Sequence, residues 1–316
     1  MKLLNVDSLS VSYSHIPTVK DISFSISPGE IVGLVGESGC GKSTLLRTLM
    51  MLMEENCQID KGAVFFEETD LTKLSEKELR LLRGKDIVMI FQNAALSSNP
   101  LHKIGHQFYE TITSHSGKMS KKECYAKAED ILKKLKFKEP KRILNSYPFE
   151  LSGGMNQRVA LALAILMNPK LILADEPTSA LDVTVQAQVI KKMRQLRESY
   201  HTAMLVVTHN MGVVAQLCDK VGVPYAGRIV EWGSVEDILE HPKHPYTQAL
   251  ISAIPEMNGE DPTGIPGSPK EFTKEEIGCD FAPRCTKAKE NCACVVPEKV
   301  VLSDEHWALC PYCREE

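Results

Sequence analysis

Alternation of apolar and polar positions, the pattern of half-buried strands, runs through residues 3–35. Residues 9–13 and 22–26 follow it most regularly, with β-branched and aromatic residues at the apolar places. Pro28 and Gly29 then predict a turn. Residues 31–35 are apolar throughout, which indicates a buried strand.

Farther along the chain, short apolar runs alternate with segments of helical periodicity. The runs that predict strands cover residues 62–66, 87–91, 171–174 and 203–208. Spacing of three to four residues predicts helices between them, one with Ala128, Ile131, Leu132 and Leu135 on its packed face. Strands that alternate with helices are typical of a mostly parallel α/β sheet.

Several helix starts are marked by capping residues. Two capping boxes are present, Ser75-x-x-Glu78 and Ser120-x-x-Glu123. Ser152 is a natural N-cap for a helix that should end near Pro169. Asp182 leads into a further helix.

Composition and charge exclude several classes of protein. The chain has 316 residues, 43% hydrophobic and 25% charged, as expected for a globular protein with a full core. Its net charge of −4 gives no global basic field of the kind that binds nucleic acid. The longest strongly apolar run, residues 159–167, falls far short of the roughly 20 residues that a membrane span needs. The first residues turn polar too early for a secretory signal, so we expect a cytosolic protein that meets membranes through a partner.

A glycine-rich loop connects the predicted strand at residues 31–35 to a predicted helix. The loop consists of Gly36, Glu37, Ser38, Gly39, Cys40, Gly41, Lys42, Ser43 and Thr44. Its pattern, G-x-x-x-x-G-K-S between a strand and a helix, predicts a phosphate-binding loop. Glycines let backbone N–H groups face a phosphate, while Lys42 reaches the β- and γ-phosphates and the Ser43 hydroxyl holds Mg²⁺.

Polar residues at two other strand ends suit the same chemistry. Asp175 and Glu176 end a buried strand, where ligands of parallel α/β sheets bind. Asp175 offers oxygen ligands to Mg²⁺, and Glu176 can polarise a water aimed at the γ-phosphate. His209 ends the next strand and is expected to touch the phosphate or that water. Ser152, Gly153 and Gly154 leave the N–H groups of a helix start bare, which favours an anion.

These elements, in this order, resemble the nucleotide-binding subunit of an ABC transporter over residues 1 to about 250. The resemblance implies ATP and Mg²⁺ as ligands and gives each position a role. Tyr13 takes the adenine-stacking position, and Gln92 the glutamine that links Mg²⁺ to the membrane subunits. Residues 151–157 form the signature, with Met155 where many members have glutamine. The implied nucleotide contacts of that segment and of the dimer-contact loop at 179–182 include Ser152, Gly153, Gly154, Gln157 and Asp182. Asp175 becomes the metal-binding acid, Glu176 the catalytic acid and His209 the switch histidine.

The resemblance also implies the fold. We expect an α/β P-loop NTPase of ABC type with a mixed or parallel core sheet, an antiparallel β subdomain and a helical signature subdomain at roughly residues 93–168. The ATPase domain should cover residues 1–254. A Pro- and Gly-rich linker should follow at 255–278, and a small Cys-rich metal-binding extension at 279–316.

Four motifs in the second half of the chain resemble the dipeptide/oligopeptide/nickel importer subfamily. They are residues 184–188, 225–231, 244–250 and 278–285. The subfamily implies pairing with a second, homologous ATPase, two transmembrane permeases contacted through the groove at 92–113, and an extracytoplasmic binding protein. The protein would then be peripheral, on the cytoplasmic face of the plasma membrane, and would energise peptide import. A nickel or metal-chelate importer is the alternative, and the usual stretch at 91–100 is altered here.

Six of the ten cysteines lie in the last 38 residues. Cys279, Cys285, Cys292 and Cys310 have the spacing C-x5-C-x6-C-x17-C, while Cys294 and Cys313 are spare. Four thiolates suit a [4Fe–4S] cluster or tetrahedral Zn²⁺, and reduced or disulfide-linked thiols are the third possibility. The spacing resembles the iron–sulfur tail of some peptide-importer ATPases, which favours the cluster.

Two other classes of function fit the sequence less well. Twin-cassette ATPases that act on ribosomes need two phosphate loops, and this chain has one. DNA-repair relatives insert long coiled coils, but only about 110 residues without sustained heptads separate Lys42 from Ser152. A thiol or metal sensor with a vestigial ATPase is opposed by the intact Glu176 and His209. We therefore expect no nucleic-acid partner.

Overall fold

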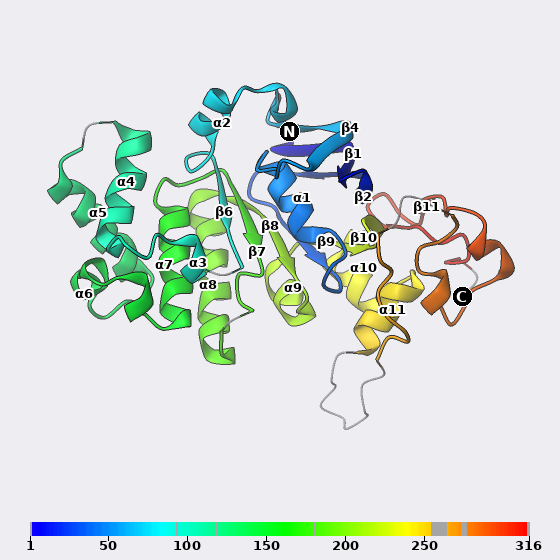
Figure 1. The fold of residues 1–316 in the computed structure, drawn as a ribbon. Coiled ribbons are helices and arrows are strands. Elements are labelled where there is room, and N and C mark those ends of the chain that lie inside the picture. The colour runs from blue at the N-terminus through cyan, green and yellow to red at the C-terminus, as the bar shows by residue number, and fades with distance from the viewer. Residues whose placement is uncertain are drawn as a thin grey trace. The chain divides into compact units, whose positions relative to one another are not determined.

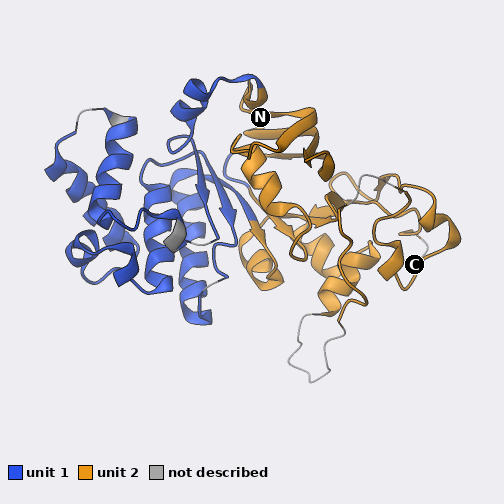
Figure 2. Ribbon diagram, in the orientation of Figure 1, with its two compact units in different colours: residues 1, 27–30, 73–206 blue, residues 2–26, 31–72, 207–316 orange. Residues whose placement is uncertain are grey.

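The computed structural model describes residues 2–92, 94–117, 119–179, 181–253, 264–272 and 277–314. The chain divides into two compact units (Figure 2). Unit 1 contains residues 27–30 and 73–206, and unit 2 contains residues 2–26, 31–72 and 207–316. Much of the linker expected at 255–278 lies outside the described residues.

Unit 2 begins with an antiparallel sheet (Figure 1). Its strands, in the order β2-β1-β4-β5, are β1 (Leu4–Tyr13), β2 (Ile16–Ile26), β4 (Cys57–Phe66) and β5 (Thr69–Asp70). The strands predicted at 9–13, 22–26 and 62–66 are confirmed as parts of longer ones. Leu4 and Val6 of β1 are buried in alternation, and Leu9 is buried beyond an irregularity in the register with β2.

A second, mixed sheet of unit 2 carries the glycine-rich loop. β3 (Ile31–Val35) pairs in parallel with β9 (Lys220–Tyr225), which pairs antiparallel with β10 (Arg228–Ser234). The C-terminal strands β12 (Trp307–Ala308) and β11 (Val300–Val301) continue the antiparallel order from β10. The helices of the unit are α1 (Lys42–Leu49), η1 (Leu71–Lys73), α9 (Met211–Leu217), α10 (Val235–Glu240), α11 (Pro245–Ser252), η3 (Ala282–Arg284) and η4 (Glu290–Ala293).

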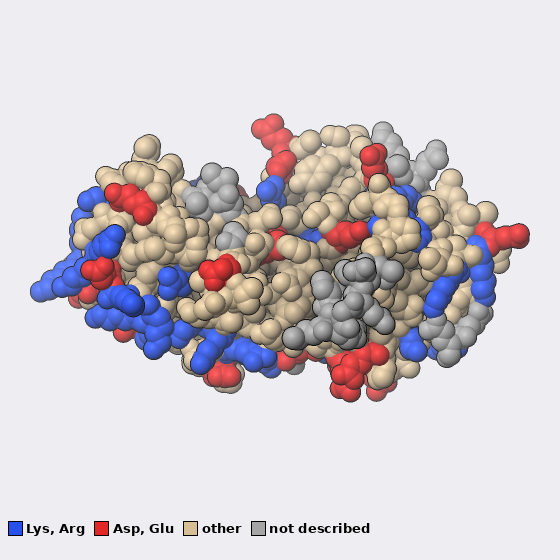
Figure 3. Space-filling model, turned by 90° about the horizontal axis from the view of Figure 1, so that it is seen from below, with Lys and Arg blue, Asp and Glu red and all other residues tan. Residues whose placement is uncertain are grey.

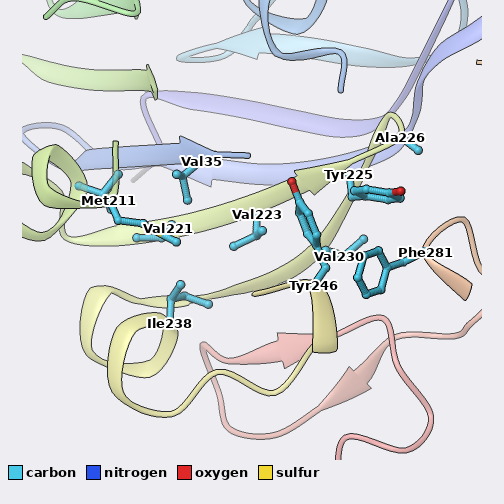
Figure 4. Packing of buried hydrophobic residues seen from close by; sticks show 11 residues of the cluster. Val35, Met211, Val221, Val223, Tyr225, Ala226, Val230, Ile238, Tyr246 and Phe281 are labelled. Atoms are coloured by element: carbon cyan, nitrogen blue, oxygen red, sulfur yellow. The ribbon is translucent and has the colours of Figure 1, made fainter. Parts of the chain in front are cut away.

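The cysteine-rich segment is built into unit 2 and shares its core. Phe281 is 2% exposed and packs against Tyr225 and Tyr246, with ring centroids 5.3 Å from each (Figure 4). Buried Glu231 of β10 accepts hydrogen bonds from the backbone N–H groups of Lys243 and His244, at 2.8 and 2.9 Å.

Glu231 also joins β10 to the last part of the chain. Its Oε1 atom lies 2.9 Å from Nε2 of His306, another buried residue. A buried carboxylate needs such partners because an unpaired charge in the interior is costly. The C-terminal hairpin is therefore fixed to the sheet by a polar anchor as well as by strand pairing.

Unit 1 combines parallel strands with the helices of the middle of the chain. β6 (Ile87–Ile90) and β7 (Leu171–Asp175) form at the apolar runs predicted at 87–91 and 171–174, and they pair in parallel. β8 (Ala203–Thr208) forms at the run predicted at 203–208. The helices are α2 (Glu76–Leu82), α3 (Ala94–Ser97), α4 (Ile104–Ser116), α5 (Lys121–Lys134), α6 (Pro140–Asn145), η2 (Pro148–Glu150), α7 (Gly153–Ile165) and α8 (Val183–Tyr200). The run α3 to α7 lies within the helical subdomain expected at 93–168.

The predicted helix starts are confirmed. Ser75 and Glu78 form a complete capping box on α2, and Ser120 and Glu123 form another on α5. Lysine and arginine gather over the end of unit 1 that holds α5 (Figure 3). The lysines of α5 alternate with acids, and Lys134 pairs with Asp130 at 2.9 Å, as on a solvated helix face. None of the described helices has the apolar length that a bilayer crossing requires.

Phe281→Ala should destabilise unit 2 by about 3–5 kcal/mol, because it removes a buried ring and leaves a cavity between two tyrosines. Phe149→Ala is the control, since that ring is 73% exposed and its loss should cost less than about 0.5 kcal/mol. Denaturant unfolding of the full chain measures both. Equal losses in the two variants would contradict the packing role of Phe281.

Candidate nucleotide site and cysteine cavity

The glycine-rich loop folds tightly around the amine of Lys42. β3 before the loop is fully buried, and α1 begins directly after Gly41. The Lys42 Nζ atom donates to the carbonyl oxygens of Gly36 and Glu37, both at 2.7 Å, and lies 3.5 Å from the Cys40 sulfur. The ammonium group is thus held at the centre of the loop, where a phosphate-binding lysine is needed.

Two glycines of the loop cannot be replaced without moving backbone. A Cβ at Gly36 would lie 2.5 Å from the Pro224 carbonyl oxygen. Gly41 has φ +99°, and a Cβ there would lie 2.6 Å from the Thr18 carbonyl oxygen. Cys40 between them is buried, and burial raises the pKa of its thiol. The loop is therefore packed against β2 and the end of β9, and its inner residues are structural.

Tyr13 and His209 also belong to unit 2. Tyr13 ends β1 opposite Cys57 of β4, and partial burial together with the Cys57 thiol raises the pKa of its hydroxyl. His209 directly follows β8 and is exposed, just before Asn210, which caps α9. Both lie at strand ends, as expected, and their contacts with nucleotide stay predictions.

The acidic pair of unit 1 follows β7. Asp175 and Glu176 are 6% and 9% exposed, and Glu176 has φ 49°. Ser179 holds this turn, because its N–H and hydroxyl both donate to the Glu176 carbonyl oxygen. Ile90 of β6 pairs with Ala174 of β7, so Gln92 and the acids follow the carboxyl ends of neighbouring parallel strands. Such an edge is where ligands of α/β sheets bind.

The signature segment forms the start of α7. The Ser152 hydroxyl accepts from the Met155 N–H at 3.4 Å, which confirms Ser152 as the N-cap. A Cβ built at Gly153 meets nothing within 4 Å, so this side of the helix start is open. Gln157 is buried, and its side-chain nitrogen donates to the Pro177 carbonyl at 2.7 Å. That bond ties α7 to the turn that carries Glu176.

Asp182 caps the following helix. Its Oδ1 atom accepts from the N–H groups of Thr184 and Val185, both at 3.0 Å, and it is exposed. Ala180, within the dimer-contact loop expected at 179–182, lies outside the described residues. The part of Asp182 in nucleotide binding stays a prediction.

A second candidate site is a cavity of about 320 Å³ in unit 2. Its wall includes five thiols, those of Cys279, Cys285, Cys292, Cys310 and Cys313. The first four are the set that the spacing singled out, and the spare Cys294 is exposed and outside the wall. Burial, with the other thiols nearby, raises the pKa of Cys310 to about 11 and raises that of Cys279. Five of the six C-terminal cysteines thus share one cavity.

An ion pair links this cysteine segment to the glycine-rich loop. The Arg284 guanidinium, beside Cys285, donates to both carboxylate oxygens of Glu37, at 2.6 and 3.0 Å. This bidentate pair raises the pKa of Arg284. The Tyr246 hydroxyl accepts from the Glu37 N–H at 2.9 Å. Glu37 is therefore held through both its side chain and its backbone by residues far along the chain.

His244 and Asp280 make further polar contacts in this part of unit 2. The His244 ring is fully buried and its Nδ1 atom accepts from the Tyr246 N–H at 3.1 Å, and burial lowers the pKa of His244 to about 3. Asp280, next to Cys279, pairs with Lys270 at 2.5 Å and with Lys20 of β2 at 3.4 Å. Sequence reasoning missed these links, although an arginine and an aspartate directly beside two cysteines were a visible signal.

Comparison with known proteins identifies the family. The profile described as "ABC transporter" matches residues 19–179, which include the glycine-rich loop, the signature and the acidic pair. The chain belongs to the ABC transporter ATPase family. A second profile, "Oligopeptide/dipeptide transporter, C-terminal region", matches residues 230–292. The family assignment rests on the motif-bearing part of the chain, and the second match covers three of the cavity cysteines.

Curated relatives align with this chain over nearly its whole length. The oligopeptide transport ATP-binding protein OppD of Haemophilus influenzae is 42% identical over 92% of this chain and 91% of its own. The dipeptide transport ATP-binding protein DppD of Bacillus subtilis is 38% identical over 98% and 94%. Among solved structures, the ATP-binding cassette MJ0796, a dimer with ADP and Pi, has TM-score 0.67 and 29% identity, over 73% of this chain and 98% of that one.

Arg284→Met and Glu37→Gln should each lower the free energy of unfolding by about 1–3 kcal/mol, because each breaks a charge-assisted pair with a nearly buried arginine. The double variant should lose clearly less than the sum of the two, by at least about 0.5 kcal/mol. Denaturant unfolding of the wild type and the three variants gives this coupling energy. Strictly additive losses would show that the pair contributes nothing.

Proposed function

We propose that this chain is the ATP-hydrolysing subunit of an ABC importer for dipeptides or oligopeptides, acting at the cytoplasmic face of the plasma membrane. The observation that carries the proposal is the lysine-centred glycine loop, joined in one chain to the signature helix and the acidic pair. Lys42 anchors the β- and γ-phosphates, and the Ser43 hydroxyl is a ligand of Mg²⁺. The names of the relatives and the C-terminal profile support peptides as the cargo.

The remaining residues take the roles that the family implies. Tyr13 stacks on adenine, while Asp175 and Gln92 complete the Mg²⁺ ligands. Glu176 polarises the attacking water, and His209 stabilises the charge on the γ-phosphoryl group while ADP departs. The low exposure of Glu176 supports its role, because a carboxylate shielded from bulk water acts more strongly on a bound one.

Dimerisation supplies the second half of the mechanism. We propose that Ser152, Gly153 and Gly154 of one ATPase contact the γ-phosphate bound by another, with Gln157 and Asp182 holding the segments on either side. The open space at Gly153 supports this, since a partner can approach the bare helix start there. By analogy with its subfamily, the partner is a second, homologous ATPase. Closure on ATP and opening after hydrolysis then make a two-state movement.

The transporter needs further subunits. We propose two transmembrane permeases that bind residues 92–113, and an extracytoplasmic binding protein that delivers the peptide. This places the chain at the membrane as a peripheral subunit. Import of nickel or metal chelates is the second candidate within the subfamily, and no relative cited above carries such a name.

Glu176→Gln should reduce ATP turnover by at least about 10²-fold while leaving ATP binding intact, because only the general base is lost. Lys42→Ala should instead abolish binding, since the phosphate anchor is gone. Phosphate release and nucleotide titration measure the two effects. Normal turnover in Glu176→Gln would show that another residue activates the water.

We further propose that the cysteine cavity holds a [4Fe–4S] cluster through Cys279, Cys285, Cys292 and Cys310. A zinc ion with bonds of about 2.3 Å brings its sulfurs to about 3.8 Å from one another. Among the described residues, no three cysteine sulfurs all lie within 4.8 Å of one another. Thiols spread around a cavity of about 320 Å³ fit a larger cluster better than one ion. The cluster would cross-link a segment that has little core of its own, with no catalytic part.

Anaerobically purified protein should be brown and contain about four iron and four sulfide per chain. Cys310→Ser should lose most of the iron, whereas Cys294→Ser should keep it, because only Cys310 lines the cavity. Iron and sulfide assays on the three proteins decide the matter. One zinc ion per chain without iron would establish zinc as the bound metal. If neither iron nor zinc is found, the cysteines are metal-free thiols or disulfides.

A further inference from the structure

Three metal-ligand side chains meet at the start of α4, outside both sites described above. His102 precedes the helix, and His106 and Glu110 follow at successive intervals of four residues on one helix face. Their ligand atoms all lie within 4.8 Å of one another, and no other group of three or more in the described part of the chain meets that condition. Neither the nucleotide chemistry nor the cysteine cavity uses these residues.

The distances within this group are those of a tetrahedral metal site. The Glu110 Oε2 atom lies 3.7 Å from Nδ1 of His102 and 3.4 Å from Nδ1 of His106. Zinc bonds of about 2.0–2.2 Å to nitrogen and oxygen separate neighbouring ligands of a tetrahedron by about 3.3–3.6 Å. The two imidazole rings lie 4.5 Å apart and are tilted by 59°. Little movement is needed to bring the three atoms onto one ion.

Two of the three ligand atoms, both of them imidazole nitrogens, lack a hydrogen-bond partner. The Nδ1 atoms of both histidines are shielded from solvent and make no hydrogen bond. In the neutral tautomer with hydrogen on Nε2, each Nδ1 directs a lone pair toward the Glu110 carboxylate. Three such acceptors converge favourably around a metal ion, or around protons carried by the histidines. The side chains of His102 and His106 as a whole are 41% and 42% exposed, which gives an ion access to the group.

We propose that His102, His106 and Glu110 bind a divalent transition-metal ion of the zinc type. Two Nδ1 atoms and one carboxylate oxygen provide three ligands, and water takes the fourth position. Imidazole with a carboxylate selects this class of ion over Mg²⁺ or Ca²⁺, which prefer oxygen ligands.

The ion would join the loop before α4 to the helix itself. Gln107 already links them, since its side chain donates to the carbonyls of Asn99 and His102. A bound ion adds a tie through the His102 side chain at the same junction. This junction lies within the segment at 92–113 that we propose contacts the permeases, so metal binding would fix the shape of that surface.

The test counts zinc on the full chain without nucleotide. Wild type, the double variant His102→Gln/His106→Gln and the control His115→Gln are titrated with Zn²⁺ by calorimetry. His115 lies on the same helix outside the group, so its replacement controls for loss of a histidine. The double variant should bind one zinc ion fewer than the wild type, and His115→Gln should bind the same number. Zinc held by the cysteines contributes equally to all three proteins.

A second variant keeps the test valid if the double variant folds poorly. Glu110→Gln preserves the side-chain shape but removes a direct ligand. It should lower the zinc affinity of this site by more than about 10–100-fold, which is the typical cost of losing an outer-shell partner. Co²⁺ bound at the group should absorb in the visible range without a thiolate charge-transfer band, and Glu110→Gln should remove that signal. Equal zinc counts and affinities in wild type, double variant and Glu110→Gln would overturn the proposal and leave protonated histidines paired with Glu110.

Discussion

The close approach of backbone around the glycine-rich loop is the constraint on which the rest of unit 2 depends. Gly36 lies against the Pro224 carbonyl and Gly41 against the Thr18 carbonyl, so the loop is packed between two other strands. Lys42 then bridges the carbonyls of Gly36 and Glu37 from inside. A phosphate site made of backbone must be rigid to be useful, because disordered N–H groups would lose entropy on binding.

The C-terminal part of the chain extends this rigidity outward. Phe281 packs in the core beside Tyr225 and Tyr246. Arg284 donates hydrogen bonds to the Glu37 carboxylate from both of its terminal nitrogens. Glu231 of β10 contacts His306 and so links the C-terminal hairpin, β11 and β12, to the sheet. The cysteine cavity therefore lies one residue away from a direct ionic contact with the phosphate loop. In this chain the cysteine-rich segment and the glycine-rich loop belong to one packed unit.

How much could be read from the sequence depended on the range of each interaction. The glycine loop, the signature cap at Ser152 and the acids after β7 were predicted, since their chemistry needs a local motif. The strands β9 and β10 were not predicted, because Pro224 and glycines interrupt the apolar pattern of their sequences. The sheet of unit 2 is mixed, which is one of the two forms that the resemblance implied. The pair of Arg284 and Glu37 spans 247 residues, beyond the reach of any local pattern.

That long separation has a consequence for the order in which the protein matures. Glu37 of the glycine loop is made 209 residues before Tyr246 and 247 residues before Arg284, the two residues that hold it. Contacts between distant parts of a chain are slow to form because a large loop must close first. A nascent chain therefore completes the contacts of Glu37 only after Arg284 has been translated. Termination before residue 284 would release a chain in which the Glu37 carboxylate lacks its arginine partner.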